Sequence, residues 1–290
     1  MHCPVCGDAN VKLAMQAINR HGRHILGQEE FDVFFCEMCK SYFLNVDLTK
    51  EYYAKYYGKA YYEQDSHSTF FTSFSSLLNR VMLGLQRKMV ERFLPKGISP
   101  LRWLDVEAGS GEFLASLPRK RFMPVACEIN PEGCELIRKK NIALYKGDFL
   151  AQDFRESFDV VSFWHVLEHV KNPLLYLQRC QSILHNDGVL VVALPNTDGL
   201  GFQLGKSWWY HMDAPRHVWL GKSKTFDFLA KKSGWKIVAR RFLFWQYPLD
   251  LFWSLGKSPW KWLVYPFYPL VKVLNQETTL YILRKELHHE

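Results

Sequence analysis

The 290-residue sequence lacks any run of about 20 consecutive apolar residues, so it does not predict a membrane-spanning helix. The nearest candidate, Trp262 to Val271, is short and is interrupted by Pro266 and Pro269. The residues after Met1 are polar and lack the apolar core of a secretory signal peptide. These absences predict a cytoplasmic protein, and an apolar content of 48% excludes an intrinsically disordered chain.

The sequence also lacks an even number of cysteines: it has seven, which argues against a framework of disulfides. Four cysteines form two Cys-x-x-Cys pairs, Cys3 with Cys6 and Cys36 with Cys39. Two such pairs can place four thiolates around one Zn²⁺ ion, so residues 1–48 are predicted to be a zinc ribbon. Because four sulfurs complete the coordination sphere, the zinc is expected to be structural; buried thiols without a metal are the alternative.

Excess positive charge is absent from the first two thirds of the chain. Residues 1–60 hold seven basic and seven acidic side chains, and residues 61–200 hold sixteen of each. Residues 201–290 hold fourteen basic and six acidic side chains, and also eight of the ten tryptophans. A uniformly basic nucleic-acid surface is therefore excluded, and the basic aromatic end favours an anionic or amphipathic partner.

Residues 49–98 are predicted to be an aromatic linker followed by a helix over 76–93. The linker is rich in aromatic residues, namely Tyr52, Tyr53, Tyr56, Tyr57, Tyr61, Tyr62, Phe70 and Phe71. We interpret them as packing between the ribbon and the next domain, with substrate contact as the alternative.

From residue 101 onward, strand patterns alternate with helix patterns. Strands are predicted over 102–106, 123–128, 143–146, 158–163 and 189–193, and helices over 112–117, 131–140 and 173–184. This order predicts a parallel sheet with helices on both faces. Ligands of such sheets bind at the carboxyl ends of the strands, where this chain has a glycine-rich turn, carboxylates and aromatic residues.

The segments between Leu101 and Trp235 are, in order, LDVEAGSGEFL, ACEINP, KGDF, FDVVSFWHVLEHVKNP, LHNDGVLVVALPN and DAPRHVWL. As an ordered set they resemble the class I S-adenosylmethionine-dependent methyltransferases, in the subgroup with an N-terminal zinc ribbon. The resemblance implies an α/β, Rossmann-like fold over residues 99–290, with a seven-stranded sheet and helices on both faces. It also implies S-adenosylmethionine as the cofactor.

The resemblance assigns roles to residues at the edge of the sheet. Asp105, Gly109 and Gly111 would hold the methionine end of the cofactor. Glu128 and Ile129 would lie at the ribose, Asp148 and Phe149 at the adenine, and Trp164 and His165 beside the sulfonium. The family turn reads D-x-G-x-G-x-G, whereas this chain has Glu107 at the first glycine. Glu107 would swing outward without effect, weaken cofactor binding by charge and bulk, or mark the loss of catalysis.

Three side chains are candidates for acceptor chemistry. His165 and His217 are candidate bases, and Arg216 could bind a phosphate or a carboxylate. A purely structural loop is the equal alternative for 208–217, and Glu168 and His169 are interpreted as packing residues.

Residues 242–275 form a hydrophobic, tryptophan-rich insertion before the last predicted strand, 279–284. It is expected to cover the acceptor pocket, to form a homodimer contact, or to touch the inner face of a membrane peripherally.

Three functions follow from these features. The first is methylation of a small or lipid-linked anionic acceptor: a nucleotide sugar, a polysaccharide precursor or a quinone-like compound. A partial resemblance to zinc-ribbon sugar C-methyltransferases supports the sugar. The second is an RNA methyltransferase that uses the ribbon as a nucleic-acid module, although the neutral ribbon disfavours nucleic acid as a partner. The third, motivated by Glu107, is a non-catalytic scaffold.

Overall fold

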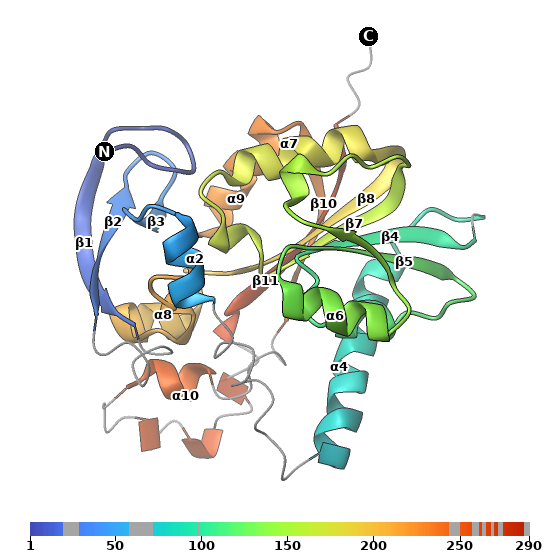
Figure 1. The fold of residues 1–290 in the computed structure, drawn as a ribbon. Helices are drawn as coiled ribbons and strands as arrows, with labels where there is room; N and C mark the ends of the chain where they lie inside the picture. The colour runs from blue at the N-terminus through green and yellow to red at the C-terminus, as the bar shows by residue number, and fades with distance from the viewer. Residues whose placement is uncertain are drawn as a thin grey trace.

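The computed structural model describes residues 1–19, 29–57, 72–97, 99–243, 250–256, 261–262, 265–267, 270–271 and 275–286. Two sheets organise this part of the chain (Figure 1). The larger sheet consists of β4 (Leu101–Val106), β5 (Phe122–Glu128), β6 (Ala143–Lys146), β7 (Phe158–Trp164), β8 (Leu184–Pro195), β10 (Trp235–Phe242) and β11 (Thr278–Lys285). The smaller sheet consists of β1 (Val11–Ile18), β2 (Glu30–Cys36), β3 (Ser41–Leu44) and β9 (Trp219–Gly221).

The larger sheet has the strand order β10-β11-β8-β7-β4-β5-β6. Strands β4 to β8 run parallel, whereas β11 is antiparallel to both β8 and β10. The chain order reverses at β4, so the carboxyl ends of β4 and β7 lie at a topological switch point where α/β proteins bind ligands. The predicted seven-stranded Rossmann-like sheet is therefore confirmed.

Helices cover both faces of this sheet. In β8, Val189 and Val191 face one core cluster and Leu190 and Val192 face the other, and all four are fully buried. The first cluster includes residues of α4 (Thr72–Glu91), α5 (Glu112–Ala115) and α6 (Pro131–Lys139). The second includes residues of α7 (Pro173–Ile183) and α9 (Ser223–Lys232), which Figure 1 shows on the opposite face. Apolar side chains on both sides of each strand are what a buried parallel sheet requires.

Strand β8 is longer than predicted. It begins at Leu184, directly after α7, whereas the sequence predicted a helix through 184 and a strand only over 189–193. Residues 185–187 of this strand are exposed and polar, which is the pattern of a loop. The strand nevertheless begins before them, because Leu184 pairs with Phe158 of β7.

The smaller sheet joins the N-terminal segment to the C-terminal one. β3 pairs antiparallel with β9 through Ser41 with Gly221 and Phe43 with Trp219. The hydroxyl of Thr225, in α9, also donates to the carbonyl of Cys39 at 2.8 Å. The smaller sheet therefore contains strands from both sides of the domain boundary predicted at residue 48, and that boundary stays a prediction.

The helix α2 (Lys50–Tyr56) begins the aromatic segment and packs on the larger domain. The Tyr52 hydroxyl donates to the carbonyl of Pro215 at 2.8 Å, and the Tyr57 hydroxyl lies 2.8 Å from Nδ1 of His169. These contacts support the packing interpretation of the first tyrosines. Tyr61, Tyr62, Phe70 and Phe71 lie outside the described residues.

Part of the predicted insertion is described, in α10 (Asp250–Ser254) and the short helix Tyr265–Phe267. Helix α10 packs closely on α8 (Leu200–Gly205), because a Cβ at Gly205 would lie 2.7 Å from the carbonyl oxygen of Ser254. Trp245 and Trp260 lie outside the described residues. No helix in the described ranges is long and apolar enough to cross a bilayer.

Candidate functional site at the carboxyl edge of the sheet

The turn after β4 has an unusual backbone. Glu107, Gly109 and Gly111 have φ values of 53°, 55° and 73°, in the left-handed region that favours glycine. A Cβ at Gly109 would meet nothing within 4 Å, whereas one at Gly111 would lie 3.1 Å from Cγ1 of Ile137. Bare backbone therefore faces open space at Gly109, as a cofactor that touches the chain closely requires.

Glu128 fixes this turn. Its two carboxylate oxygens accept the backbone N–H of Gly109 and of Asn130, both at 2.7 Å, and burial raises the pKa of the carboxyl group. Gly133, which the sequence analysis missed, lies against the same turn, because a Cβ there would be 2.8 Å from the carbonyl oxygen of Gly109. A glycine in the first turn of a predicted helix was the available signal. Ile129, beside Glu128, is exposed.

Asp105 lies beneath the turn. Its carboxylate accepts the Ser162 hydroxyl at 2.6 Å, and Ser162 in turn accepts from the Trp103 indole at 2.9 Å. Burial, with a smaller contribution from Glu128, raises the pKa of Asp105 to about 7 although the Ser162 hydrogen bond opposes this. Its position supports the cofactor turn from inside the sheet.

Asp148 and Phe149 differ in their surroundings. The Asp148 carboxylate caps a short helix by accepting the N–H of Leu150 at 3.1 Å. The Phe149 ring is 2% exposed and stacks on Tyr176, with ring centroids 5.5 Å apart. The ring therefore belongs to the core, which leaves Asp148 as the polar group at this strand end.

Trp164 and His165 end β7. The Trp164 ring packs on Phe113, and its buried Nε1 has no hydrogen-bond partner among the described residues. A buried N–H without a partner is costly, so this atom fits a site completed by a ligand. Nδ1 of His165 lies 3.1 Å from the buried Glu168 carboxylate, which the sequence analysis assigned to packing.

The Glu107 side chain is open to solvent at the centre of several carboxylates. Desolvation by the surrounding protein, followed by Glu128, Asp148 and Glu168, raises its pKa to about 8. These effects favour the protonated, uncharged form of the carboxyl group, which would reduce the charge that the cofactor carboxylate meets.

Glu107→Gly is expected to tighten S-adenosylmethionine binding several-fold and to stabilise the fold by about 1 kcal/mol, because glycine adopts positive φ without strain. Affinity of the unmodified chain should fall as pH rises through about 8, since ionised Glu107 repels the cofactor carboxylate. Calorimetric titration from pH 7 to 9 measures both. Glu107→Gln keeps the strain and removes only the charge; a pH dependence unchanged in both variants would contradict this role.

Arg216 and His217 lie on the loop that precedes β9. The Arg216 guanidinium pairs with Asp213 at 2.6 Å, so part of its hydrogen-bonding capacity is already used. His217 is 8% exposed, and its ring lies 4.7 Å from that of His169. Burial lowers the pKa of His217 to about 4, which makes it a weaker base than an ordinary imidazole.

The four ribbon cysteines come together as predicted from their spacing. Sγ of Cys3 lies 3.6 Å from that of Cys39, and Sγ of Cys6 lies 3.5 Å from that of Cys36. All four sulfurs are within 4.8 Å of one another. Four thiolates about 2.3 Å from one Zn²⁺ ion would be about 3.8 Å apart in a tetrahedron, so the cluster fits zinc.

Comparisons with known proteins agree with this site. A family model described as a methyltransferase domain matches residues 79–240, more than half of the chain. The ubiquinone biosynthesis O-methyltransferase of Cereibacter sphaeroides is 27% identical over 178 residues, which cover 56% of this chain and 70% of that protein. The protein of the same name from Rhodopseudomonas palustris TIE-1 is 29% identical over 112 residues, which cover 36% of this chain and 44% of that relative. The chain thus spans less than half the length of the second relative.

Two solved structures share the fold at low sequence identity. A chain in the complex of the Haloferax volcanii Trm112 activator with a methyltransferase has a TM-score of 0.55 and 14% identity, over 74% of this chain and 94% of that one. The cyclase SpnF has a TM-score of 0.50 and 13% identity, over 71% of this chain and 81% of that one. These likenesses establish the fold, and the family match establishes the chemistry. The chain belongs to the methyltransferase-domain family and is an S-adenosylmethionine-dependent methyltransferase.

Proposed function

We propose that this enzyme methylates a hydroxyl group of a small or lipid-linked anionic acceptor, with a quinone-like phenol as the favoured class. The observation that carries the proposal is the hydrogen bond between His165 and the buried Glu168 at the end of β7. The O-methyltransferase relatives support the same acceptor class. A nucleotide sugar or polysaccharide precursor shares the anionic character but not the acidic hydroxyl.

The pair can act as a base. When Nδ1–H of His165 donates to Glu168, Nε2 keeps its lone pair and can accept a proton from the acceptor hydroxyl. The carboxylate would then stabilise the imidazolium that forms. A phenol is a suitable substrate, because removing its proton makes the oxygen a nucleophile.

The cofactor would bind along the edge already described. When bound, S-adenosylmethionine supplies an electrophilic methyl group on its sulfonium. Gly109 offers bare backbone, Glu128 and Asp148 offer carboxylates, and Trp164 offers an N–H to the ligand. The protein's main contribution is to hold the acceptor oxygen in line with the methyl group.

An acceptor screen tests the proposal. The purified protein is incubated with labelled S-adenosylmethionine and catechols, quinols, a nucleotide sugar, or RNA. Methyl ethers formed on catechols or quinols support the proposal, whereas methylation of only sugar or RNA would overturn it. Salt-sensitive binding of RNA in a gel-shift assay would favour the nucleic-acid alternative.

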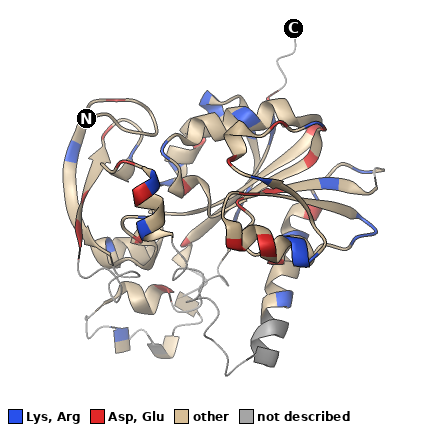
Figure 2. Cartoon of the chain, viewed as in Figure 1, with Lys and Arg blue, Asp and Glu red and all other residues tan. Residues whose placement is uncertain are grey.

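We also propose a peripheral contact with the inner face of an anionic membrane, through a surface that we call the aromatic corner. Its side chains are 37–65% exposed and comprise Leu204, Trp208, Trp253, Trp262, Phe267 and Leu270. Lys206 and Lys261 belong to the same part of the chain. Asp250 is the acidic residue that the structure describes in 200–208, 250–256, 261–262, 265–267 and 270–271, and it is buried. Figure 2 marks basic positions of the ribbon in blue and acidic positions in red. Exposed aromatic residues combined with lysine suit an anionic interface. A homodimer contact through the same surface is the competing proposal.

Trp262→Ala is expected to weaken binding to vesicles containing anionic lipid several-fold, since it removes a ring that is 63% exposed. Vesicle co-sedimentation at low and high salt measures the effect. Val238→Ala, which removes an exposed apolar side chain from β10, is the control. Equal binding of both variants, or a dimer that dissociates in Trp262→Ala, would argue against the membrane contact.

A further inference from the structure

Three potential metal ligands meet beside the proposed base. Glu168 and His169 lie in a short 3-10 helix after β7, and His217 lies in the loop that precedes β9. One ligand atom from each of these side chains lies within 4.8 Å of the other two. Two imidazoles and one carboxylate are a common ligand set for divalent transition metals, and they leave coordination positions open.

Both imidazoles are held as metal-binding histidines usually are. Nδ1 of His169 lies 3.1 Å from the carbonyl oxygen of Arg216, and Nδ1 of His217 lies 2.7 Å from that of His211. A backbone carbonyl can only accept, so Nδ1 of His217 carries the proton and its Nε2 keeps a lone pair. Nδ1 of His169 also lies 2.8 Å from the Tyr57 hydroxyl, which can donate or accept. Such backbone contacts fix the tautomer and orientation of ligating histidines.

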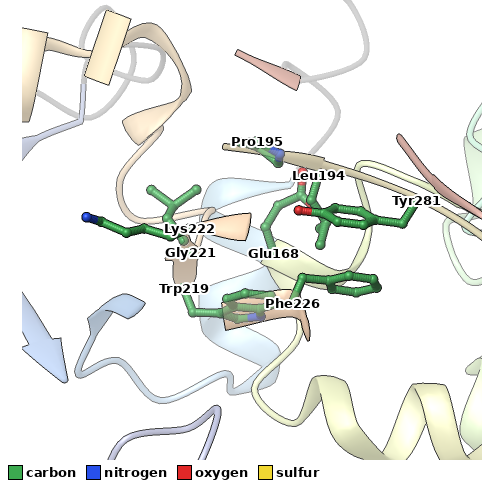
Figure 3. A pocket seen from close by; sticks show the side chains of 9 residues that line it. Glu168, Leu194, Pro195, Trp219, Gly221, Lys222, Phe226 and Tyr281 are labelled. Atoms are coloured by element: carbon green, nitrogen blue, oxygen red, sulfur yellow. The ribbon is translucent and has the colours of Figure 1, made fainter. Parts of the chain in front are cut away.

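Glu168 adds a buried negative charge. It is 1% exposed, and its Oε2 has no hydrogen-bond partner among the described residues, while its Oε1 contacts His165. Figure 3 shows Glu168 among mostly apolar side chains that line a pocket, including Leu194, Trp219 and Phe226. A buried carboxylate oxygen without a donor is unfavourable, and a bound cation would compensate for it.

The charges near the cluster permit a cation. The Arg216 guanidinium lies close enough to lower the pKa of both histidines, but it forms an ion pair with Asp213 at 2.6 Å. Asp213 Oδ2 also lies 3.9 Å from Nε2 of His217. Arginine and aspartate therefore offset each other, and Glu168 remains the uncompensated charge of the cluster.

The geometry points to a binding site for one divalent first-row transition ion, such as Zn²⁺ or Fe²⁺, formed by Glu168, His169 and His217. This site is separate from the four-cysteine cluster. The open coordination positions of the ion suit the hydroxyl oxygen of an acceptor. This role in acceptor binding rests on the proposed function, whereas metal binding itself does not.

Cobalt(II) substitution tests the site independently of activity. Metal-free protein is titrated with Co²⁺ while its absorption is recorded, because thiolate ligands give a charge-transfer band that nitrogen and oxygen ligands lack. The unmodified chain is expected to bind two ions, one with the thiolate band and one without. His217→Gln should keep the thiolate band and lower the affinity for the second ion on the order of 100-fold or more.

The controls separate metal binding from folding and from catalysis. Glu168→Gln should also lose the second ion, and S-adenosylmethionine binding reports whether each variant is folded. Asp250→Asn is the matched control, because His211, Asp250 and Glu277 form another buried group with three ligand atoms within 4.8 Å. The proposal is overturned if the unmodified chain binds only the thiolate-bound ion, or if Asp250→Asn and not His217→Gln loses the second. Methyl transfer that fails while two ions bind would contradict the proposed function alone.

Discussion

Cys39→Ser is expected to abolish the predicted zinc site and to lower the melting temperature of the whole chain by about 10 °C. Structural zinc has an apparent binding free energy of roughly 10–16 kcal/mol in zinc-finger peptides. A loss of about a third of this free energy from the stability of a domain of this size would lower its melting temperature by about 10 °C. Cys39 is 5% exposed, and its sulfur lies 3.6 Å from that of Cys3. Calorimetry and a chromophoric chelator measure melting and zinc release.

The effect should spread beyond the ribbon, because β3 pairs with β9 and Thr225 of α9 binds the carbonyl of Cys39. Hydrogen exchange is therefore expected to rise in β9 as well as in β1 to β3. Cys180→Ser is the control, since this buried cysteine lies in α7, outside the cluster. A Cys39→Ser protein that retains one zinc ion and its melting temperature would show that the cluster is not a structural zinc site.

The central sheet could be predicted because its signals are local. The strands are apolar on both faces, as in Val189–Ala193, and turns and capped helices separate them. Asn130, for example, caps α6 by accepting the N–H groups of Glu132 and Gly133. The carboxyl ends of parallel strands meet at one edge, so the order of the segments was enough to bring Asp105, Glu128 and Asp148 near one another.

Other features depend on contacts between distant segments and left no local signal. β9 has three residues, which are too few for a recognisable alternation. It is a strand only because β3 offers a partner 180 residues earlier, in the pairing of Ser41 with Gly221. His165 and Lys40 adopt positive φ, which their residue types do not indicate. The sequence also does not indicate that the Phe149 ring packs on Tyr176 and Phe163 in the core, and its role at the adenine stays a prediction.

The candidate base is a similar case. The sequence singled out His165 as a candidate base but interpreted Glu168 and His169 of the same motif as packing residues. The structure separates them, because His165 contacts Glu168 whereas His169 contacts the carbonyl of Arg216 and the hydroxyl of Tyr57. Distance and burial, and not residue type, divide the motif into the proposed base, the carboxylate that would orient it and a buried imidazole.

His165→Gln is expected to lower kcat for a phenolic acceptor by about 10²–10⁴-fold, the usual contribution of a general base, while cofactor affinity stays within about twofold. The loss of kcat should be greatest with a weakly acidic phenol, because a more acidic phenol is already ionised and needs no base. The limb of the pH profile on which the rate rises as His165 loses its proton should disappear in the variant.

Isothermal titration with S-adenosylmethionine and pH-dependent turnover with two phenols of different acidity measure these effects. His185→Gln is the matched control, since His185 is an exposed residue at the start of β8. If both phenols lose rate equally and the pH profile keeps its shape, His165 positions the acceptor and another group takes the proton. A variant as active as the His185→Gln control would remove His165 from the mechanism, and with it the reason to prefer a hydroxyl acceptor over a sugar carbon.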